Sequence, residues 1–428
     1  MINIRQDVYS RLIYTLFFTL IISVFLTGYS LAVTRTVTNL NDDGNGSLRD
    51  IMGNVAQPGD DIVFDPSLAG ETINLTTGVL PIIGFDLTIT GPADNPITLD
   101  ANMNDRIFEI SGGANVVLSN LIIANGFISG GGIQQGGAIL TDDDANLEVN
   151  DCTFINNSVE ADCSGFCAAT GGAISTDGRL TVRRSTFVGN SAHCSTNEEF
   201  CFSFGGAIDH EGDNDDLLVL ENNTLCDNEV TCSGSGCFLI GGALSIEDPP
   251  GLLNNNTFSN NKTFCDSDNC LLEIGSSIGL QGNPFTATEL LNNIIHNDPG
   301  VTVPNCGGPE EQIIDGGNNL QFPGTSCGAT IPTADAMLGP LADNGGITQT
   351  KAITEESPAF NEGNNATCEA TDQRGVPRPQ ALICDIGAYE LIVPSEIPTL
   401  SEWGLIAMAG ILGIVGFMVM RRRAVINS

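Results

Sequence analysis

Short runs of alternating apolar and polar residues recur along the central part of this chain. Each run covers only a few residues and is interrupted by Gly, Asn or Asp, which indicates short β-strands joined by turns and excludes a helical repeat. Each repeat carries a Gly-Gly motif, and successive motifs start 35, 34, 36 and 34 residues apart. The motifs are Gly136–Ile139, Gly171–Ile174, Gly205–Ile208, Gly241–Leu244 and the degenerate Gly275–Ile278. A Phe-x-x-Asn pattern recurs between them in constant phase, which indicates one repeated structural unit.

The repeat predicts an all-β fold, a right-handed parallel β-helix. One unit cannot bury its apolar residues alone, whereas copies stacked at about 4.8 Å place Ile on Ile and Phe on Phe in a continuous core. The same stacking aligns Asn157, Asn190, Asn228 and Asn261 in one column, which we expect to form a hydrogen-bonded Asn ladder. The Gly-Gly pairs mark sharp turns where side chains would collide.

Residues 1–32 have the pattern of a secretory signal peptide. Arg5 and Arg11 precede an apolar run from Leu12 to Tyr29, and Ser30-Leu31-Ala32 has the form of a signal-peptidase site. We therefore expect export through the Sec pathway. The alternative is an uncleaved membrane anchor.

Residues 33–110 are expected to hold an N-terminal cap and the first coils of the β-helix. Ser47 followed by Asp50 has the form of a helix N-cap, so the sequence predicts a short helix from Leu48 to Ala56 that covers the open end of the stack. The β-helix repeats then occupy residues 111–300, followed by a Gly/Pro/Cys-rich segment at 301–335. A capping module is expected at 336–392, as a charge-paired cap over the last coil.

The 14 cysteines indicate an oxidising compartment, because most occur as close pairs beside the Gly-Gly motifs. We expect each of these pairs to close a small loop that leaves the stack and returns to it. The expected disulfides are Cys163/Cys167, Cys194/Cys201, Cys232/Cys237, Cys265/Cys270, Cys306/Cys327 and Cys368/Cys384. Cys152 and Cys226 are left unassigned. A zinc site would need His and Cys at ligand spacing, and the chain has only three His, so disulfides are preferred.

The charge balance excludes nucleic acid as a partner. The chain holds 52 acidic and 15 Lys or Arg residues, a formal net charge of −37. Such a surface repels polyanions and favours solubility or cation binding.

The last segment, residues 393–428, has the organisation of a sorting signal. The motif residues Ile397, Pro398, Thr399, Leu400, Trp403 and Gly404 precede an apolar run and the cluster Arg421, Arg422 and Arg423. The sequence predicts one transmembrane helix over 404–420, which is just long enough to span a bilayer core at about 1.5 Å per residue. The arginines would stay on the cytoplasmic side.

Four segments resemble known bacterial families. The Gly-Gly-Ala-Ile and Phe-x-x-Asn repeats resemble chlamydial polymorphic outer-membrane proteins, which are surface passengers. The segment "TVTNLNDDGNGSLRD" through "GDDIVF" is similar to CSLREA-type N-terminal domains, although the CSLREA string is absent. The segment "LGPLADNGGITQTKAI" to "CDIGAYE" resembles the choice-of-anchor Q domain, and the tail resembles the IPTL-CTERM signal. The last resemblance implies a processing protease of exosortase type in the inner membrane of a Gram-negative bacterium, transient anchoring there and transfer to the cell surface or matrix.

These observations predict a non-catalytic surface protein that contacts a polysaccharide, matrix or host surface and needs no cofactor. The alternative is a lyase or hydrolase acting on extracellular polysaccharide. Its candidate residues are the acidic runs Asp142–Asp144 and Asp209–Asp216, which we interpret as solvated turns. Within the second run, Asp209, Glu211, Asp213 and Asp215 are weak candidates for Ca²⁺ binding.

Overall fold

The chain divides into two compact units, Met1–Leu391 and Ile392–Ser428. The computed structural model describes residues 32–196, 200–212, 216–234, 236–248, 250–266, 270–282, 287–309, 312–393 and 402–426. Residues 1–31 of the predicted signal peptide and the residues Ile397–Leu400 lie outside the described residues.

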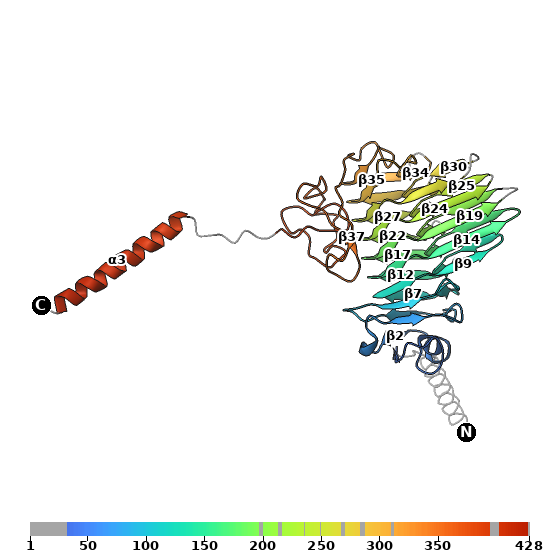
Figure 1. Ribbon diagram of the computed structural model, residues 1–428, viewed down its shortest axis with the longest axis horizontal. Helices are drawn as coiled ribbons and strands as arrows, with labels where there is room; N and C mark the ends of the chain where they lie inside the picture. The colour runs from blue at the N-terminus through green and yellow to red at the C-terminus, as the bar shows by residue number, and fades with distance from the viewer. Residues whose placement is uncertain are drawn as a thin grey trace, which may run out of the picture. The chain divides into compact units, whose positions relative to one another are not determined.

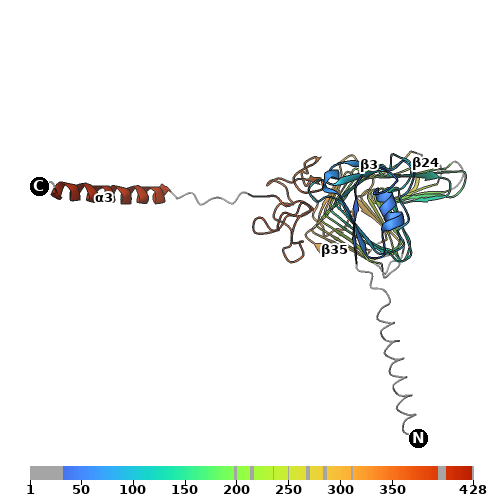
Figure 2. The ribbon, with the colours of Figure 1, turned by 90° about the horizontal axis from the view of Figure 1, so that it is seen from below.

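The first unit is a parallel β-helix, as the sequence predicts (Figure 1). Viewed from below, its coils superimpose as a closed ring with a flat extension on one side (Figure 2). Three long sheets, A, B and C, enclose the main core. Two shorter sheets, D and E, form the extension, which we call the wing.

Sheet A is the ten-stranded sheet, and all its neighbouring strands pair in parallel. Its strands are β1 (Thr34–Val37), β2 (Asp60–Phe64), β4 (Leu87–Thr90), β7 (Asn115–Ser119), β12 (Asn146–Asn150), β17 (Arg179–Arg183), β22 (Leu218–Glu221), β27 (Gly251–Asn254), β32 (Thr288–Leu291) and β35 (Ile313–Gly317). Sheet B follows it around each coil, with β3 (Thr72–Asn74), β5 (Ile97–Asp100), β8 (Leu121–Ala124), β13 (Thr153–Ile155), β18 (Thr186–Val188), β23 (Thr224–Cys226), β28 (Thr257–Ser259), β33 (Ile294–His296) and β36 (Leu320–Phe322).

Sheet C closes each coil before the chain returns to sheet A. Its strands are β6 (Phe108–Ile110), β11 (Ile139–Thr141), β16 (Ile174–Thr176), β21 (Ile208–His210), β26 (Leu244–Glu247), β31 (Ile278–Gln281) and β34 (Cys306–Gly307). Each Gly-Gly-Ala-Ile motif runs into one of these strands, so its Ile or Leu stacks on that of the next coil.

The wing is inserted between sheets B and C. Sheet D contains β9 (Phe127–Gly130), β14 (Ser158–Cys163), β19 (Ser191–Thr196), β24 (Glu229–Gly234) and β29 (Lys262–Cys265). Sheet E contains β10 (Ile133–Gln135), β15 (Cys167–Thr170), β20 (Cys201–Phe204), β25 (Cys237–Ile240) and β30 (Cys270–Ile274). The wing has its own small core, in which Val159, Ala192, Val230 and Leu239 pack with the buried cysteines. The segments interpreted as loops that leave the stack are therefore paired strands.

The main core confirms the expected stacking of like residues. The rings of Phe154 and Phe187 stack with centroids 4.6 Å apart and planes 1° from parallel. The predicted Asn ladder is also present, and in it the side-chain amide of Asn190 donates to Asn228 over 2.9 Å. A second, unpredicted ladder runs through four asparagines at the turns between sheets A and B. These are Asn223, Asn256, Asn293 and Asn319.

Glycine is required at both positions of the complete Gly-Gly turns, whereas the degenerate last motif carries Ser276 at the second position. Gly171 has φ +63°, a left-handed conformation that costs little only for glycine. A Cβ on Gly172 would lie 2.1 Å from the backbone oxygen of Gly206 in the next coil. The recurring pair therefore reflects both a turn and a close contact between coils.

The N-terminal end of the core is covered as expected, although not by a regular α-helix. The helix α2 (Leu48–Asp50) continues directly into a wider π-helical turn, η1 (Ile51–Val55), and a 3-10 turn, η2 (Pro66–Leu68), follows later. The Ser47 hydroxyl accepts the backbone N–H of Asp50 at 3.2 Å, which is the predicted cap. Leu48, Ile51 and Met52 are buried in the main core, so this segment seals its open end.

The module at residues 336–391 lies along the side of the β-helix, which corrects the expectation that it covers the last coil. It contains the antiparallel pair β37 (Leu341–Ala342) and β38 (Thr350–Lys351). Gln373 inserts between two coils, accepting from Thr224 at 2.6 Å and donating to Thr186 at 2.9 Å. The outward-facing threonines of sheet B are thus buried beneath the module, which bridges several coils laterally.

Ion pairs buried within the module fix its shape. Arg378 and Glu390 lie 3.0 Å apart with side chains about 1% exposed. Arg374 pairs with Asp372 at 2.7 Å and stacks on Tyr389 at 3.7 Å from the ring centroid. The residues of all three hydrophobic clusters lie within the first unit, so this unit can fold without the second.

Candidate functional site

The second unit contains the helix α3 (Glu402–Ile426), which extends beyond the predicted span at both ends. Its window Leu405–Arg422 has a mean hydropathy of 1.7 and none of it is buried, so by length and composition α3 is suited to cross a membrane. Trp403 and Gly404 lie in the first turn of α3, and Arg421 and Arg422 lie near its end. The apolar helix and the basic end of the predicted sorting signal are therefore one continuous element.

The structure joins five of the six expected cysteine pairs by disulfides. They are Cys163–Cys167, Cys194–Cys201, Cys232–Cys237, Cys306–Cys327 and Cys368–Cys384. The sixth expected pair, Cys265 and Cys270 in the last coil of the wing, is not joined, which corrects that expectation. The first three disulfides each tie sheet D to sheet E within one coil.

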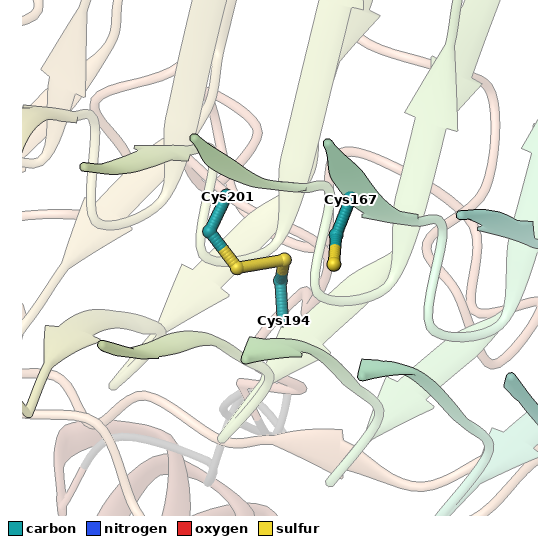
Figure 3. A group of neighbouring side chains, drawn as sticks. All are labelled: Cys167, Cys194 and Cys201. Carbon is teal, nitrogen blue, oxygen red and sulfur yellow. A yellow bond between two sulfur atoms is a disulfide. The ribbon is translucent and has the colours of Figure 1, made fainter. Parts of the chain in front are cut away.

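Disulfides of adjacent coils lie close together in the wing. Figure 3 shows Cys167 beside the disulfide between Cys194 and Cys201, and the three sulfur atoms lie within 4.8 Å of one another. Zinc binds thiolates, whereas Cys167 is itself bonded to Cys163. This cluster is therefore a stack of disulfides.

The two unassigned cysteines remain outside the disulfides. Cys152 and Cys226 are buried, and burial raises the pKa of each thiol to about 12. Since the thiolate is the reactive form, both are expected to be unreactive in the folded protein.

The acidic residue Asp209 is not in a solvated turn, which corrects the interpretation of the second acidic run. It lies in β21 with 0% exposure, and neither carboxylate oxygen has a hydrogen-bond partner among the described residues. Burial raises the pKa of Asp209 well above its usual value and the adjacent carboxylate of Glu211 raises it further, while the hydroxyls of Ser245 and Thr170 act in the opposite direction. Asp213 and Asp215, the other two Ca²⁺ candidates, lie outside the described residues.

Further carboxylates continue along the edge of sheet C next to this residue. Asp177 occupies the position of Glu211 one coil earlier, and Glu247 the same position one coil later. Burial, with the nearby charges of Glu211, Asp143 and Asp142, raises the pKa of Asp177 to about 6. The two acidic runs therefore converge on one face of the stack, as their positions after the Gly-Gly motifs indicate.

An aromatic ladder lies on sheet E beside this acidic row. The rings of Phe202 and Phe238, on adjacent coils, stack at 4.8 Å with planes 11° apart. Phe166 extends the ladder by one coil, with its ring 5.2 Å from Phe202, and is 53% exposed. Phe204 lies two residues after Phe202 on the same strand, and the centroids of the two rings are 5.9 Å apart.

Phe166, Phe202 and Phe204 from the aromatic side and Glu211 and Glu247 from the acidic row line one groove of about 390 Å³, and Phe238 continues the ladder beyond it. Its walls are Ile133, Gln135, Phe166, Ala168, Thr170, Phe202, Phe204, Glu211, Glu247 and Gln281. Sequence reasoning missed the aromatic wall. The strands Cys201-Phe-Ser-Phe204 and Cys237-Phe-Leu-Ile240 alternate a buried cysteine with an outward phenylalanine, and this alternation was the available signal.

The basic side chains of the central region are all engaged in ion pairs. Arg179, Arg183, Arg184 and Lys262 are the Lys and Arg residues of positions 110–300. Their carboxylate partners are Asp216 at 4.0 Å, Glu221 at 2.6 Å, Asp151 at 2.6 Å and Glu229 at 2.8 Å, respectively. None of these basic residues lines the groove.

Comparisons with known proteins support the sorting signal. A family model of the IPTL-CTERM motif matches residues 397–423. Among solved structures, the chain is similar to pectate lyase Pel9A, with a TM-score of 0.33, 12% identity, and coverage of 85% of this chain and 97% of that one. It is also similar to the PL6 family alginate lyase AlyGC, with a TM-score of 0.16, 12% identity, and coverage of 80% and 58%. A search of curated protein sequences finds no match. Likeness this slight carries no argument about activity.

Proposed function

We propose that this chain is a non-catalytic cell-surface protein of a Gram-negative bacterium, exported through the Sec pathway and processed at its C-terminus by an exosortase-type protease in the inner membrane. The β-helix would then serve as a stalk that contacts extracellular polysaccharide, matrix or host surface. The observation that carries this proposal is the IPTL-CTERM match over the exposed apolar helix α3.

The composition and disulfides of the first unit support an extracellular location. Five disulfides persist only where thiols are oxidised. A formal net charge of −37 favours solubility outside the cell.

One observation favours keeping an enzyme as the second candidate. Asp209 lies beside Glu211, which lines a groove, and burial raises the pKa of Asp209 well above its usual value. A carboxyl group kept protonated in this way next to a second carboxyl group can act as a general acid in glycoside hydrolysis. Eliminative cleavage of acidic sugars would instead need a basic side chain beside such carboxylates. The central Arg and Lys residues pair elsewhere, so hydrolysis is the form of this alternative that the groove favours.

The sorting proposal is tested by cell fractionation combined with mass determination of the mature C-terminus. We expect the mature protein to lack Leu405–Ser428 and to leave the inner membrane. Pro398→Ala should trap the full-length chain at the inner membrane, whereas the matched control Pro394→Ala, outside the motif, should be processed normally. Retention of α3 in the mature surface protein would overturn the proposal.

The enzyme alternative is tested by a screen of the first unit against acidic and neutral polysaccharides, with and without Ca²⁺. We expect no cleavage. Cleavage that is abolished by Asp209→Asn would replace the adhesive function by the hydrolase.

A further inference from the structure

The groove between sheets C and E has features that the fold does not require. A solenoid needs apolar residues between its sheets, whereas Phe202 and Phe238 occupy the same outward position on adjacent coils. Phe166, in the coil before them, is not in register with Phe202, but its ring lies 5.2 Å from that of Phe202 and continues the row. Contiguous exposed apolar surface of this kind is costly in a secreted protein and marks an interaction site. The regular spacing along the stack suits an extended ligand that lies along the same axis.

The opposite wall of the groove is acidic. Glu211 and Glu247 line it, and Asp177 continues the row one coil earlier. Arg106 donates to the backbone oxygen of the groove residue Gln135 at 3.1 Å, and its charge is offset by an ion pair with Glu109 at 3.8 Å. A ligand with positive charge is therefore complementary to this wall, whereas an acidic polysaccharide or a nucleic acid would be repelled.

The buried carboxyl group of Asp209 gives an independent indication of a missing polar partner. It is 0% exposed, both oxygens lack hydrogen-bond partners, and it lies against Glu211 and Thr170, two residues that line the groove. A buried carboxyl group without a partner is costly in its charged form unless a cation or donor approaches, and otherwise burial favours the protonated form. A positively charged group held by Glu211 would lower that cost.

We propose that this groove binds a polysaccharide chain that carries ammonium groups, with its sugar rings lying on the Phe166, Phe202 and Phe238 ladder and its ammonium groups facing Glu211 and Glu247. Aromatic faces attract both the apolar faces of sugar rings and nearby cations. The inference rests on the proposed function and deepens it, because it names the ligand class of the adhesive surface.

The test is calorimetric titration of the first unit with the hexamer of glucosamine, and with the hexamer of N-acetylglucosamine, which has the same rings without the charge. We expect the charged hexamer to bind and added salt to weaken it, since the contact is partly ionic. Phe202→Ala should weaken binding about fivefold, the scale of one exposed cation–π contact. Glu211→Gln should weaken it about tenfold.

Matched controls on the outer face of sheet D separate the groove from general surface effects. Phe264→Ala removes an aromatic ring that is 55% exposed, and Glu160→Gln removes an exposed carboxylate, so neither should change the affinity. Circular dichroism would verify that each variant keeps its strands.

Several results would overturn the inference. Absence of binding, equal binding of both hexamers, or equal losses in the groove and control variants would each do so. If hexalysine binds as tightly as the glucosamine hexamer, the groove recognises positive charge alone and not sugar rings, which would also overturn the inference. None of these outcomes bears on whether α3 is removed, so failure of the groove and failure of the sorting proposal are distinguishable.

Discussion

The Asn ladder offers the sharpest test of how this protein is held together. In Asn228→Ala, the side-chain oxygen that accepts from the backbone N–H of Asn190 at 3.1 Å is lost. The amide that donates to the backbone oxygen of Phe187 at 3.1 Å is lost as well. Asn228 is 0% exposed, so water cannot replace these contacts without opening the coil.

The magnitude follows from the two backbone groups that lose their side-chain partner. A buried polar group without a hydrogen bond costs about 1–3 kcal/mol, so we expect the substitution to lower the free energy of unfolding by about 2–6 kcal/mol. That is a large part of the roughly 5–15 kcal/mol that stabilises a typical domain. Because each coil contacts only its neighbours, the loss should be greatest in the coils on either side of the substitution.

The assay is urea unfolding of the first unit followed by circular dichroism, with amide hydrogen exchange to locate the weakened coils. Asn146→Ala is the matched control, because this half-buried residue lies in sheet A away from both ladders. We expect the control to change stability by less than about 0.5 kcal/mol. If Asn228→Ala and Asn146→Ala shift the unfolding midpoint equally, the ladder contributes no more than ordinary surface contacts and the reasoning is refuted.

Three further predictions concern other parts of the first unit. His210 is buried, and burial lowers its pKa to about 4 from 6.5 because it penalises the charged ring. The unfolded chain therefore binds a proton more tightly than the folded chain does. The free energy of unfolding should be highest above about pH 6.5 and should fall by about 3 kcal/mol as the pH drops to 4. Thermal unfolding across this range would measure the loss, and His210→Gln should remove this part of it. Gly206→Ala should prevent folding, because the added Cβ would lie 2.1 Å from a backbone oxygen of the next coil. In the control Gly84→Ala, the added Cβ would meet no atom within 4 Å, so this variant should fold. The yield of secreted protein would distinguish the two variants. Arg378→Met leaves the carboxylate of Glu390 buried without its cation and should destabilise the module by about 3–5 kcal/mol, seen as rapid limited proteolysis that the wild-type module resists.

The sorting signal and the repeated coil could be predicted because their information is local. A membrane-spanning run needs only length, apolarity and flanking charge, all of which are contiguous from Trp403 to Arg423. The coil is specified by a short repeat, and because each copy packs on the next, a residue type that recurs at one phase, such as the Asn of the Phe-x-x-Asn pattern, must form a column.

The tertiary structure alone decided how segments of different kinds meet. The wing could not be recognised as two sheets from the sequence. Each of its strands pairs only with the corresponding strand of a neighbouring coil, and the close cysteine pairs between its strands suggested closed loops. The module's position depended on the fit of Gln373 between Thr186 and Thr224, which lie about 150 to 190 residues away in sequence.

The groove likewise could not be predicted from the sequence alone. The sequence places Phe202 on one strand and Glu211 directly after the next strand, but it does not determine the angle at which the two strands meet. Only the turn at the Gly-Gly motif brings the outer faces of sheets E and C together, so that an aromatic ladder and an acidic row become the two walls of one site. The sequence by itself therefore determined the period, the columns and the anchor, which depend on neighbours along the chain or along the stack. The lateral contacts between sheets were decided by three-dimensional packing.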